Sequence, residues 1–241
     1  MSRPFLTAEW RHLVLANYAV EPALLVPYLP TGTTLDLWNG TCYLSLVGFL
    51  FKDTRLRGIP IPFHRDFEEV NLRFYVKREE AGAVKRGVVF VQEIVPKPAL
   101  SWVARTIYRE PYRTLPMSHV LRVRPEKKDV FASYAWRCRG QEHVLKVFGG
   151  LEPTELIEGS EAEFITEHYW GYTRIRHGVT NAYEVRHPRW RVHPVYHHGV
   201  HVDFGLVYGE RFRFLNDATP ISVMLAEGSP VQVMRGERLD P

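Results

Sequence analysis

The feature that most constrains this chain is a succession of short runs rich in β-branched and aromatic residues, separated by glycine and proline. Thr41–Phe51 predicts a strand with buried side chains on much of both faces. Val70–Lys77 and Gly87–Ile94 predict two more strands, and the GAVKRG stretch at 82–87 predicts the hairpin turn between them. Further strands are expected over Asp129–Cys138, His143–Phe148, Tyr169–Arg176, Asn181–Val185, His201–Tyr208 and Pro230–Met234. Strands with such short, turn-rich connections indicate a sandwich or barrel and not βαβ units.

Helices are expected at three points of the chain. Pro22–Leu29 predicts a short helix bounded by prolines. A second helix begins at Pro98, because proline suits a first helical turn and the apolar residues after it share one helical face. These residues are Leu100, Val103, Ala104, Ile107 and Tyr108. Ser160 and Glu163 form a capping-box pattern, which predicts the start of a third helix.

The length of the chain bounds its domain organisation. It has 241 residues, of which 45% are hydrophobic, so it can bury a large core. All-β barrels and sandwiches of this size are often single domains. No linker rich in Gly, Ser or Pro divides the sequence, so we predict one domain over residues 1–241.

Cysteine usage and charge indicate the compartment and exclude some partners. Cys42 and Cys138 are the only cysteines and suit a reducing compartment. The first twelve residues, MSRPFLTAEWRH, lack the apolar core of a signal peptide. The longest apolar stretch, Tyr43–Phe51, is too short to span a membrane. A formal charge of +4 is a weak case for nucleic acid. We therefore expect a cytoplasmic protein that binds neither nucleic acid nor membrane.

Six stretches together resemble a known family. They are LPTGTTLDLWNGTCYLSLVGFLF (29–51), GIPIPFHRDFEEVNLRFYVK (58–77), GVVFVQEIVPKPALSWVARTIYREPY (87–112), EFITEHYWGY (163–172), YEVRHPRW (183–190) and LAEGSPVQV (225–233). In this order they resemble the YqjF-like family of uncharacterised bacterial proteins, which belongs to the acetoacetate decarboxylase-like superfamily. The resemblance runs through nearly the whole chain.

This resemblance implies a fold and a way of working. The fold is mainly β (α+β): a strongly bent antiparallel sheet forms a barrel or cone, with a few peripheral helices. The enzyme that names the superfamily uses a Schiff-base lysine in an apolar cavity, with acidic residues nearby. Related members form oligomers, so a homo-oligomer is expected by analogy.

Lys97 is the candidate Schiff-base lysine. It follows a predicted strand and precedes the helix that begins at Pro98, and Pro96-Lys97 resembles the lysine motif of the enzyme. A neutral lysine amine can attack a carbonyl carbon. The enzyme has a second lysine where this chain has Pro98. The alternative interpretation is a surface lysine near a helix start.

Glu69 is the candidate acidic partner, because Asp66-Phe-Glu-Glu-Val70 resembles the run that supplies an acidic active-site residue in the enzyme. In a strand, Glu69, Asn71 and Arg73 share one face. A cavity-facing Glu69 can orient a carbonyl compound or transfer a proton, with Arg73 as a substrate-binding residue. The alternative is a Glu–Arg pair on a solvated face.

Arg105 and Tyr108 are further candidates for substrate binding. Both lie in the stretch WVARTIYREPY at 102–112. A guanidinium such as that of Arg105 can hold a carboxylate through two parallel hydrogen bonds. The alternative is a helix whose arginine bonds to a neighbouring loop.

We predict no metal and no organic cofactor. His197, His201 and Asp203 would share a face of a strand, which makes them weak candidates for a metal site. We expect His168 and His187 to be hydrogen-bonded core residues beside aromatic neighbours. No glycine-rich nucleotide-binding motif occurs.

Two interpretations of function remain open. In the first, a small keto acid or carbonyl compound meets Lys97 and Glu69 and undergoes lyase-like chemistry through an iminium. In the second, the same interior holds a small molecule with no covalent step. A third and plainer possibility is a structural or interaction protein whose interior is filled by side chains.

Overall fold

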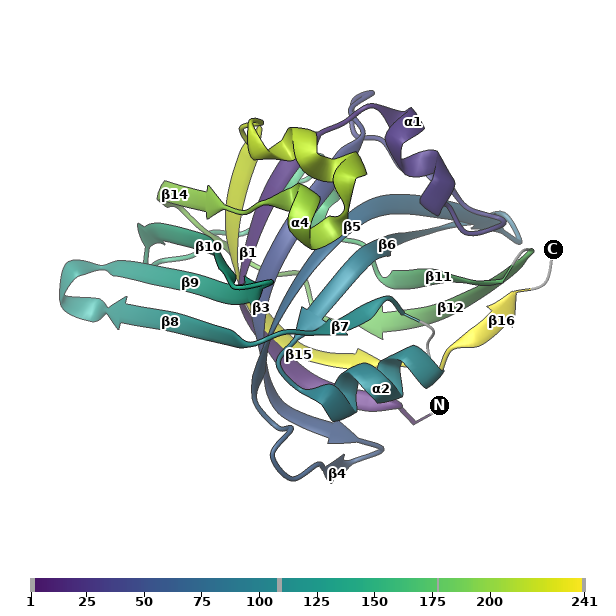
Figure 1. The fold of residues 1–241 in the computed structure, drawn as a ribbon, viewed down its shortest axis with the longest axis horizontal. Coiled ribbons are helices and arrows are strands. Elements are labelled where there is room, and N and C mark those ends of the chain that lie inside the picture. Colours follow the sequence, from purple (N-terminus) through teal and green to yellow (C-terminus); the bar gives the residue numbers. More distant parts are fainter. Residues whose placement is uncertain (1–2, 108–109, 177, 240–241) are drawn as a thin grey trace.

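A strongly curved, 12-stranded sheet makes up most of the molecule (Figure 1). The structure is a computed structural model, which describes residues 3–107, 110–176 and 178–239, without the side chains of residues 100, 103–105, 107 and 176. The predicted mainly β fold with a strongly bent sheet is confirmed.

The large sheet follows the order β13-β15-β1-β3-β5-β6-β11-β12-β16, with β2, β4 and β7 attached at its edges. β12 also pairs with β15, so the path that runs from β15 through β1, β3, β5, β6 and β11 returns to β15. Most pairings are antiparallel, as predicted, but the short pairings of β6 with β11 and with β7 are parallel. The bounds are β1 Leu6–Ala19, β2 Thr34–Leu35, β3 Tyr43–Leu56, β4 Ile59–Pro60, β5 Phe67–Glu80, β6 Ala83–Val95, β7 Tyr112–Thr114, β11 Trp170–Arg176, β12 Val179–Arg186, β13 Val192–His193, β15 Ser222–Val233 and β16 Glu237–Leu239.

A second, four-stranded sheet covers one face of the first. Its order is β14-β10-β9-β8, with β8 Met117–Arg124, β9 Asp129–Cys138, β10 Gln141–Gly150 and β14 Val195–His201. The hairpin of β8 and β9 projects away from the body of the molecule (Figure 1).

The two faces of β3 explain its long apolar run. Leu44 and Leu46 pack in one core cluster with residues of β9 and β10, whereas Val47 and Phe49 belong to a second cluster on the opposite face. Because both faces are covered, nine consecutive residues from Tyr43 are buried, as the sequence predicts. Gly48 lets the two sheets approach, since an added Cβ would lie 2.8 Å from Cδ2 of Tyr134.

The helices are short and lie at the two ends of the curved sheet, α1 and α4 at one end and α2 at the other (Figure 1). Their bounds are α1 Pro22–Leu25, α2 Pro98–Ile107, α3 Glu161–Thr166 and α4 Phe204–Tyr208, with 3₁₀ turns at Val26–Tyr28, Pro125–Lys127 and Glu210–Asn216. The predicted capping box is confirmed, because Ser160 Oγ accepts a hydrogen bond from Glu163 N at 3.2 Å. In the described part of the chain, no helix has the length and hydropathy needed to cross a membrane.

Two predictions about local structure are wrong. The segment His201–Tyr208 is not a strand: β14 ends at His201, and Asp203 Oδ1 accepts a hydrogen bond from Leu206 N at 3.0 Å, which caps α4. The hairpin turn is also shorter than predicted: Glu80 pairs directly with Ala83, so most of the GAVKRG stretch belongs to β6. Ala81 and Gly82 form this turn with φ angles of 50° and 78°, as two-residue hairpins require.

We predict that Gly228→Ala destabilises the fold more than Gly140→Ala. Both glycines have positive φ, 77° and 84°, but a Cβ at Gly228 would overlap the carbonyl oxygen of Trp10 on β1, whereas a Cβ at Gly140 meets nothing within 4 Å. We expect a loss of about 1 kcal/mol at Gly140 from φ alone and about 2–4 kcal/mol at Gly228, where overpacking adds to it. Urea denaturation measures both, and equal losses would contradict the close approach of β1 and β15.

Candidate functional site

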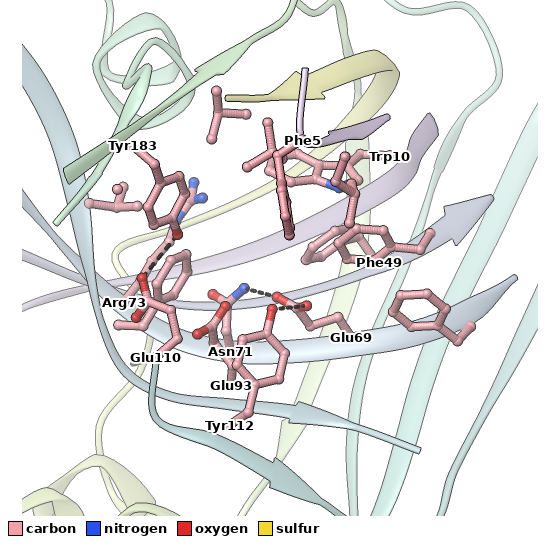
Figure 2. Close-up of a pocket in the computed structure, with 18 of the residues that line it drawn as sticks. Phe5, Trp10, Phe49, Glu69, Asn71, Arg73, Glu93, Glu110, Tyr112 and Tyr183 are labelled. Atoms are coloured by element: carbon pink, nitrogen blue, oxygen red, sulfur yellow. Dashed lines mark hydrogen bonds between the residues drawn. The ribbon is translucent and has the colours of Figure 1, made fainter. Parts of the chain in front are cut away.

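A cavity of about 210 Å³ lies against the inner face of the curved sheet. Its apolar lining includes Phe5, Leu6, Trp10, Leu13, Phe49, Phe51, Leu56, Ile61, Phe67, Val88, Phe90, Trp170, Val185 and Val233. Its polar lining includes Glu69, Asn71, Arg73, Glu93, Glu110, Tyr112, His64, His168 and Tyr183. The two kinds of side chain are segregated, with Phe5, Trp10 and Phe49 on one side and the carboxyl groups on the other (Figure 2).

The aromatic wall is a packed set of rings from β1, β3 and β5. The ring centroid of Trp10 lies 5.3 Å from that of Phe49 and 5.7 Å from that of Phe51, both in edge-to-face geometry. Phe51 stacks on Phe67 with 4.6 Å between centroids. Because these rings hold one another in place, the wall is a preformed apolar surface.

The polar wall is centred on Glu69. Its Oε1 accepts a hydrogen bond from Asn71 Nδ2 and its Oε2 accepts one from Tyr112 Oη, both at 3.0 Å (Figure 2). Glu93 of β6 lies beside this group, because Glu93 and Asn71 are partners in the β5–β6 register. The side chains of β5, β6 and β7 thus meet at one place.

Glu110 extends the polar wall from the segment just before β7. Its Oε1 accepts a hydrogen bond from Tyr183 Oη of β12 at 3.0 Å (Figure 2). Gly171 of β11 makes room for the tyrosine, since an added Cβ would overlap the Tyr183 ring. Residues from distant parts of the chain therefore complete the wall.

Burial sets the charge of the three carboxyl groups. Glu69, Glu93 and Glu110 are 2%, 3% and 4% exposed. Loss of water raises the pKa of Glu69 and that of Glu110 to about 7, although hydrogen bonds to each carboxylate act in the opposite direction. Burial, together with the charges of Glu110 and Glu69, raises the pKa of Glu93 well above its ordinary value. Protonated carboxyl groups therefore persist in this wall near neutral pH.

Glu69 and Arg73 come together at the cavity. Arg73 Nη2 donates to the Ile165 carbonyl at 3.4 Å, and its guanidinium lies 5.7 Å from the Tyr75 ring centroid. Its positive charge opposes the rise in the pKa of Glu69. The two side chains thus line a buried cavity and not a solvated face.

The other predicted site residues are placed differently. Lys97 is half-buried after β6 and is not among the described residues that line the cavity, although Glu93 before it and Ala99 after it are. Arg105 lies in α2, and its side chain falls outside the described part. Tyr108 lies outside the described residues. The roles of Lys97, Arg105 and Tyr108 stay predictions.

The histidine-rich segment does not assemble a metal site. Within the described ranges, no group of three His, Cys, Asp or Glu side chains is arranged to hold a metal ion. Asp203 is used to cap α4, while His197 and His201 lie on β14, where the His197 ring stacks on Phe148 with 6.3 Å between centroids. The weak metal candidates His197, His201 and Asp203 are thus not brought together.

His168 and His187 are hydrogen-bonded, as expected. His168 Nε2 lies 3.2 Å from Asp36 Oδ2, and His187 Nδ1 lies 2.9 Å from the Pro188 carbonyl. His168 is buried and also lines the cavity, which the sequence interpretation did not include. His187 is half-buried and stacks on Trp190.

Sequence reasoning missed Glu93, Glu110 and Tyr183 as members of the site. Glu93 carried a usable signal, since a carboxylate near the end of the apolar run Gly87–Ile94 needs a polar environment wherever that strand is buried. Glu110 and Tyr183 carried none, because they meet only when β7 and β12 take their places.

Comparison with known proteins identifies the family. Residues 7–230 match the DUF2071 family model, whose description is "uncharacterized conserved protein". The chain belongs to the DUF2071 family. One similar sequence is the uncharacterized protein YqjF of Bacillus subtilis (strain 168), which is 31% identical over 104 residues. That alignment covers 43% of this chain and 41% of YqjF.

Solved structures share the fold of this DUF2071 chain at low sequence identity. Acetoacetate decarboxylase from Legionella pneumophila has a TM-score of 0.66 and 12% identity, over 98% of this chain and 87% of that one. The enduracididine biosynthesis enzyme MppR has a TM-score of 0.68 and 12% identity, over 100% and 89%. An acetoacetate decarboxylase-like enzyme from Sphingomonas wittichii RW1 has a TM-score of 0.67 and 11% identity, over 100% and 94%. These likenesses establish an acetoacetate decarboxylase-like fold for the DUF2071 chain.

The raised pKa values of Glu69 and Glu110 predict that these two groups contribute less to the stability of this DUF2071 chain as the pH rises from about 4.5 to 7, whereas His12 and His168, whose pKa values burial lowers to about 4, contribute in the opposite direction. In that range each of the two carboxyl groups keeps a proton in the folded chain that it has released in the unfolded chain, so its contribution to the free energy of unfolding falls with pH, by on the order of 3 kcal/mol per group. Glu110→Gln removes one such group and also relieves Glu93, so we expect the stability of the variant relative to the wild type to increase with pH, and the variant to be the more stable protein at pH 8.

The control is Glu142→Gln, at an exposed position of β10. Urea denaturation at pH 5, 6, 7 and 8 measures all three proteins. A stability difference between Glu110→Gln and the wild type that stays constant from pH 5 to 8 would contradict the assignment of protons to the buried wall.

Proposed function

We propose that this protein binds a small, largely apolar molecule in the cavity of the curved sheet. The observation that carries this proposal is the segregated lining, with packed aromatic rings on one side and three buried carboxyl groups on the other (Figure 2). Mostly apolar cavities with a few convergent polar groups are typical ligand sites. An apolar cavity of about 150 Å³ accommodates benzene, so 210 Å³ suits a ligand of roughly that size carrying a short polar group.

A purely structural role accounts poorly for this lining. Burying an ionisable group costs several kcal/mol. Three buried carboxyl groups meet here, and none of them forms a salt bridge with a described residue that lines the cavity. Apolar side chains would fill the space at lower cost. Perturbed carboxyl groups gather at functional sites, and this supports a ligand-binding role.

The shared fold also supports binding of a small molecule. MppR is known in complex with pyruvate and with the condensation product of pyruvate and imidazole 4-carboxaldehyde. Those ligands belong to MppR, and the sequence identity of 11–12% extends only the fold to this chain.

We predict that Ala99→Trp blocks the cavity. Ala99 is exposed, occupies the second position of α2 and lines the cavity, so an indole there fills space at little cost to the core. The matched control is Ala23→Trp, because Ala23 is exposed at the second position of α1, also directly after a proline. We expect toluene and indole to raise the Tm of the wild type and of Ala23→Trp, and to bind Ala99→Trp at least ten times more weakly. Identical Tm shifts for the two variants would count against binding in this cavity.

The second candidate function is lyase-like chemistry at Lys97, as the family resemblance implies. The observation in its favour is that Lys97 lies between Glu93 and Ala99, two residues that line the cavity. In this scheme the Lys97 amine adds to the carbonyl of a β-keto acid and water leaves, which forms an iminium. The bond to the carboxylate breaks, CO₂ departs, and the electron pair moves into an enamine. Arg73 holds the carboxylate until CO₂ departs. A protonated carboxyl group such as that of Glu69 then donates a proton to the enamine carbon. Water finally hydrolyses the resulting iminium and releases the ketone.

Borohydride trapping tests this candidate. The protein is incubated with acetoacetate and borohydride, and peptides are analysed by mass spectrometry. The scheme predicts a reduced adduct on Lys97 that is lost in Lys97→Arg and kept in the control Lys85→Arg, since Lys85 is ion-paired with Glu80 on the β5–β6 hairpin. An unmodified Lys97 in the wild-type protein would remove the lyase candidate and leave the binding proposal intact.

A further inference from the structure

We infer that the cavity recognises a positively charged, hydrogen-bond-donating head, such as an ammonium or amidinium group, attached to a small apolar body. This inference rests on the proposed binding function and names the class of ligand. It is carried by the charge of the polar wall and by the hydrogen-bond acceptors that the chain leaves without donors.

The polar wall has an excess of acidic groups. Among the described residues that line the cavity, Glu69, Glu93 and Glu110 are accompanied by one guanidinium, that of Arg73, and by no lysine. His168 adds no charge at neutral pH, because burial lowers its pKa to about 4. One positive charge cannot balance three carboxylates, so the wall needs either bound protons or a cation from outside the chain.

Hydrogen-bond accounting points to a donor-rich ligand. Three buried oxygens, Asn71 Oδ1, Glu93 Oε2 and Glu110 Oε2, have no hydrogen-bond partner among the described residues. Once the two carboxyl groups are ionised, all three are acceptors, on side chains that are at least 96% buried. The nearby tyrosine hydroxyls are already engaged, that of Tyr112 with Glu69 and that of Tyr183 with Glu110. An ammonium or amidinium group brings several donors and a positive charge at once.

Arg73 Nε and Thr173 Oγ1 are two buried donors at this wall that lack a partner in the described part of the chain. The Arg73 guanidinium donates to the Ile165 carbonyl through Nη2 and already opposes the rise in the pKa of Glu69, so it offsets one carboxylate. The Thr173 hydroxyl lies beside Glu110 and can serve one acceptor there. Asn71 Oδ1 and Glu93 Oε2 are left for the ligand.

Binding of such a head exchanges protons for the ligand. The groups that face the carboxyls are Asn71 and Arg73 from β5, Tyr112 from β7, Thr173 from β11 and Tyr183 from β12. With the pKa of Glu69 and that of Glu110 near 7, their protons leave within the physiological pH range. A cationic ligand therefore binds with proton release and more tightly as the pH rises from 6 to 8.

Three probes of one size test the inference by isothermal titration calorimetry. Benzylamine is cationic at pH 6 and 8, benzyl alcohol is its neutral counterpart, and phenylacetate is an anionic relative. We expect benzylamine to bind at least ten times more tightly than benzyl alcohol at pH 8, to lose most of this preference at pH 6, and to release protons, measured in buffers of different ionisation enthalpy. Phenylacetate should bind most weakly at pH 8.

Two variants locate the effect. Glu110→Gln should reduce the ratio of benzylamine affinity to benzyl alcohol affinity at least fivefold, whereas the exposed control Glu142→Gln should leave that ratio unchanged. The comparison of probes on the wild-type chain needs no variant, so it stands even where Glu110→Gln folds poorly.

The outcomes separate the two proposals. Equal binding of benzylamine and benzyl alcohol at pH 8 overturns the cationic head and leaves the binding cavity standing. Tighter binding of phenylacetate also overturns it and favours the keto-acid candidate, in which Arg73 holds a carboxylate. If none of the three probes binds, and toluene and indole leave the Tm unchanged, both the cavity function and its ligand class are wrong.

Discussion

The antiparallel register between β5 and β6 is the constraint on which the candidate site depends. This register places Asn71 of β5 opposite Glu93 of β6. Glu69 lies two residues before Asn71 on β5, so two carboxyl groups and an amide share one face. Because side chains alternate with a period of two, a slip of β6 by one residue would turn Glu93 away from Glu69 and into the apolar core on the opposite face. The packing of Leu44, Leu46 and Leu72 in that core therefore also fixes the polar wall on the other side.

The sequence predicts the parts of this arrangement that arise within one strand. The apolar run of β3 indicates burial on both faces, and the spacing of Glu69, Asn71 and Arg73 indicates a common face. It does not reveal which strands will be neighbours. Glu110 reaches the wall because β7 pairs with the end of β6, and Tyr183 reaches it because β12 follows β11 around the curve. Those are long-range pairings with no local pattern.

Local signals misled the prediction where a short capping interaction outweighed β propensity. The run His201–Tyr208 contains valine, phenylalanine and tyrosine, all strand-forming residues. Asp203 nevertheless satisfies the Leu206 amide and also accepts from Asn216 Nδ2 at 3.1 Å, which ties α4 to the 3₁₀ turn that follows. Because the Asp203 carboxylate caps α4, it does not join His197 and His201. The same error in secondary structure therefore accounts for the wrong strand and for the metal candidates that are not brought together.

The polar wall also decides between the two candidate functions in electrostatic terms. A keto-acid carboxylate that enters the cavity meets three carboxyl groups and one guanidinium, so it is accepted only while most of those groups are protonated. A cationic head meets the same groups and is accepted only once they ionise. Because the pKa values of Glu69 and Glu110 lie near 7, the two demands fall on opposite sides of neutral pH. At neutral pH and above, the acidic excess therefore favours the cation, and lyase chemistry at Lys97 requires that the wall keep its protons.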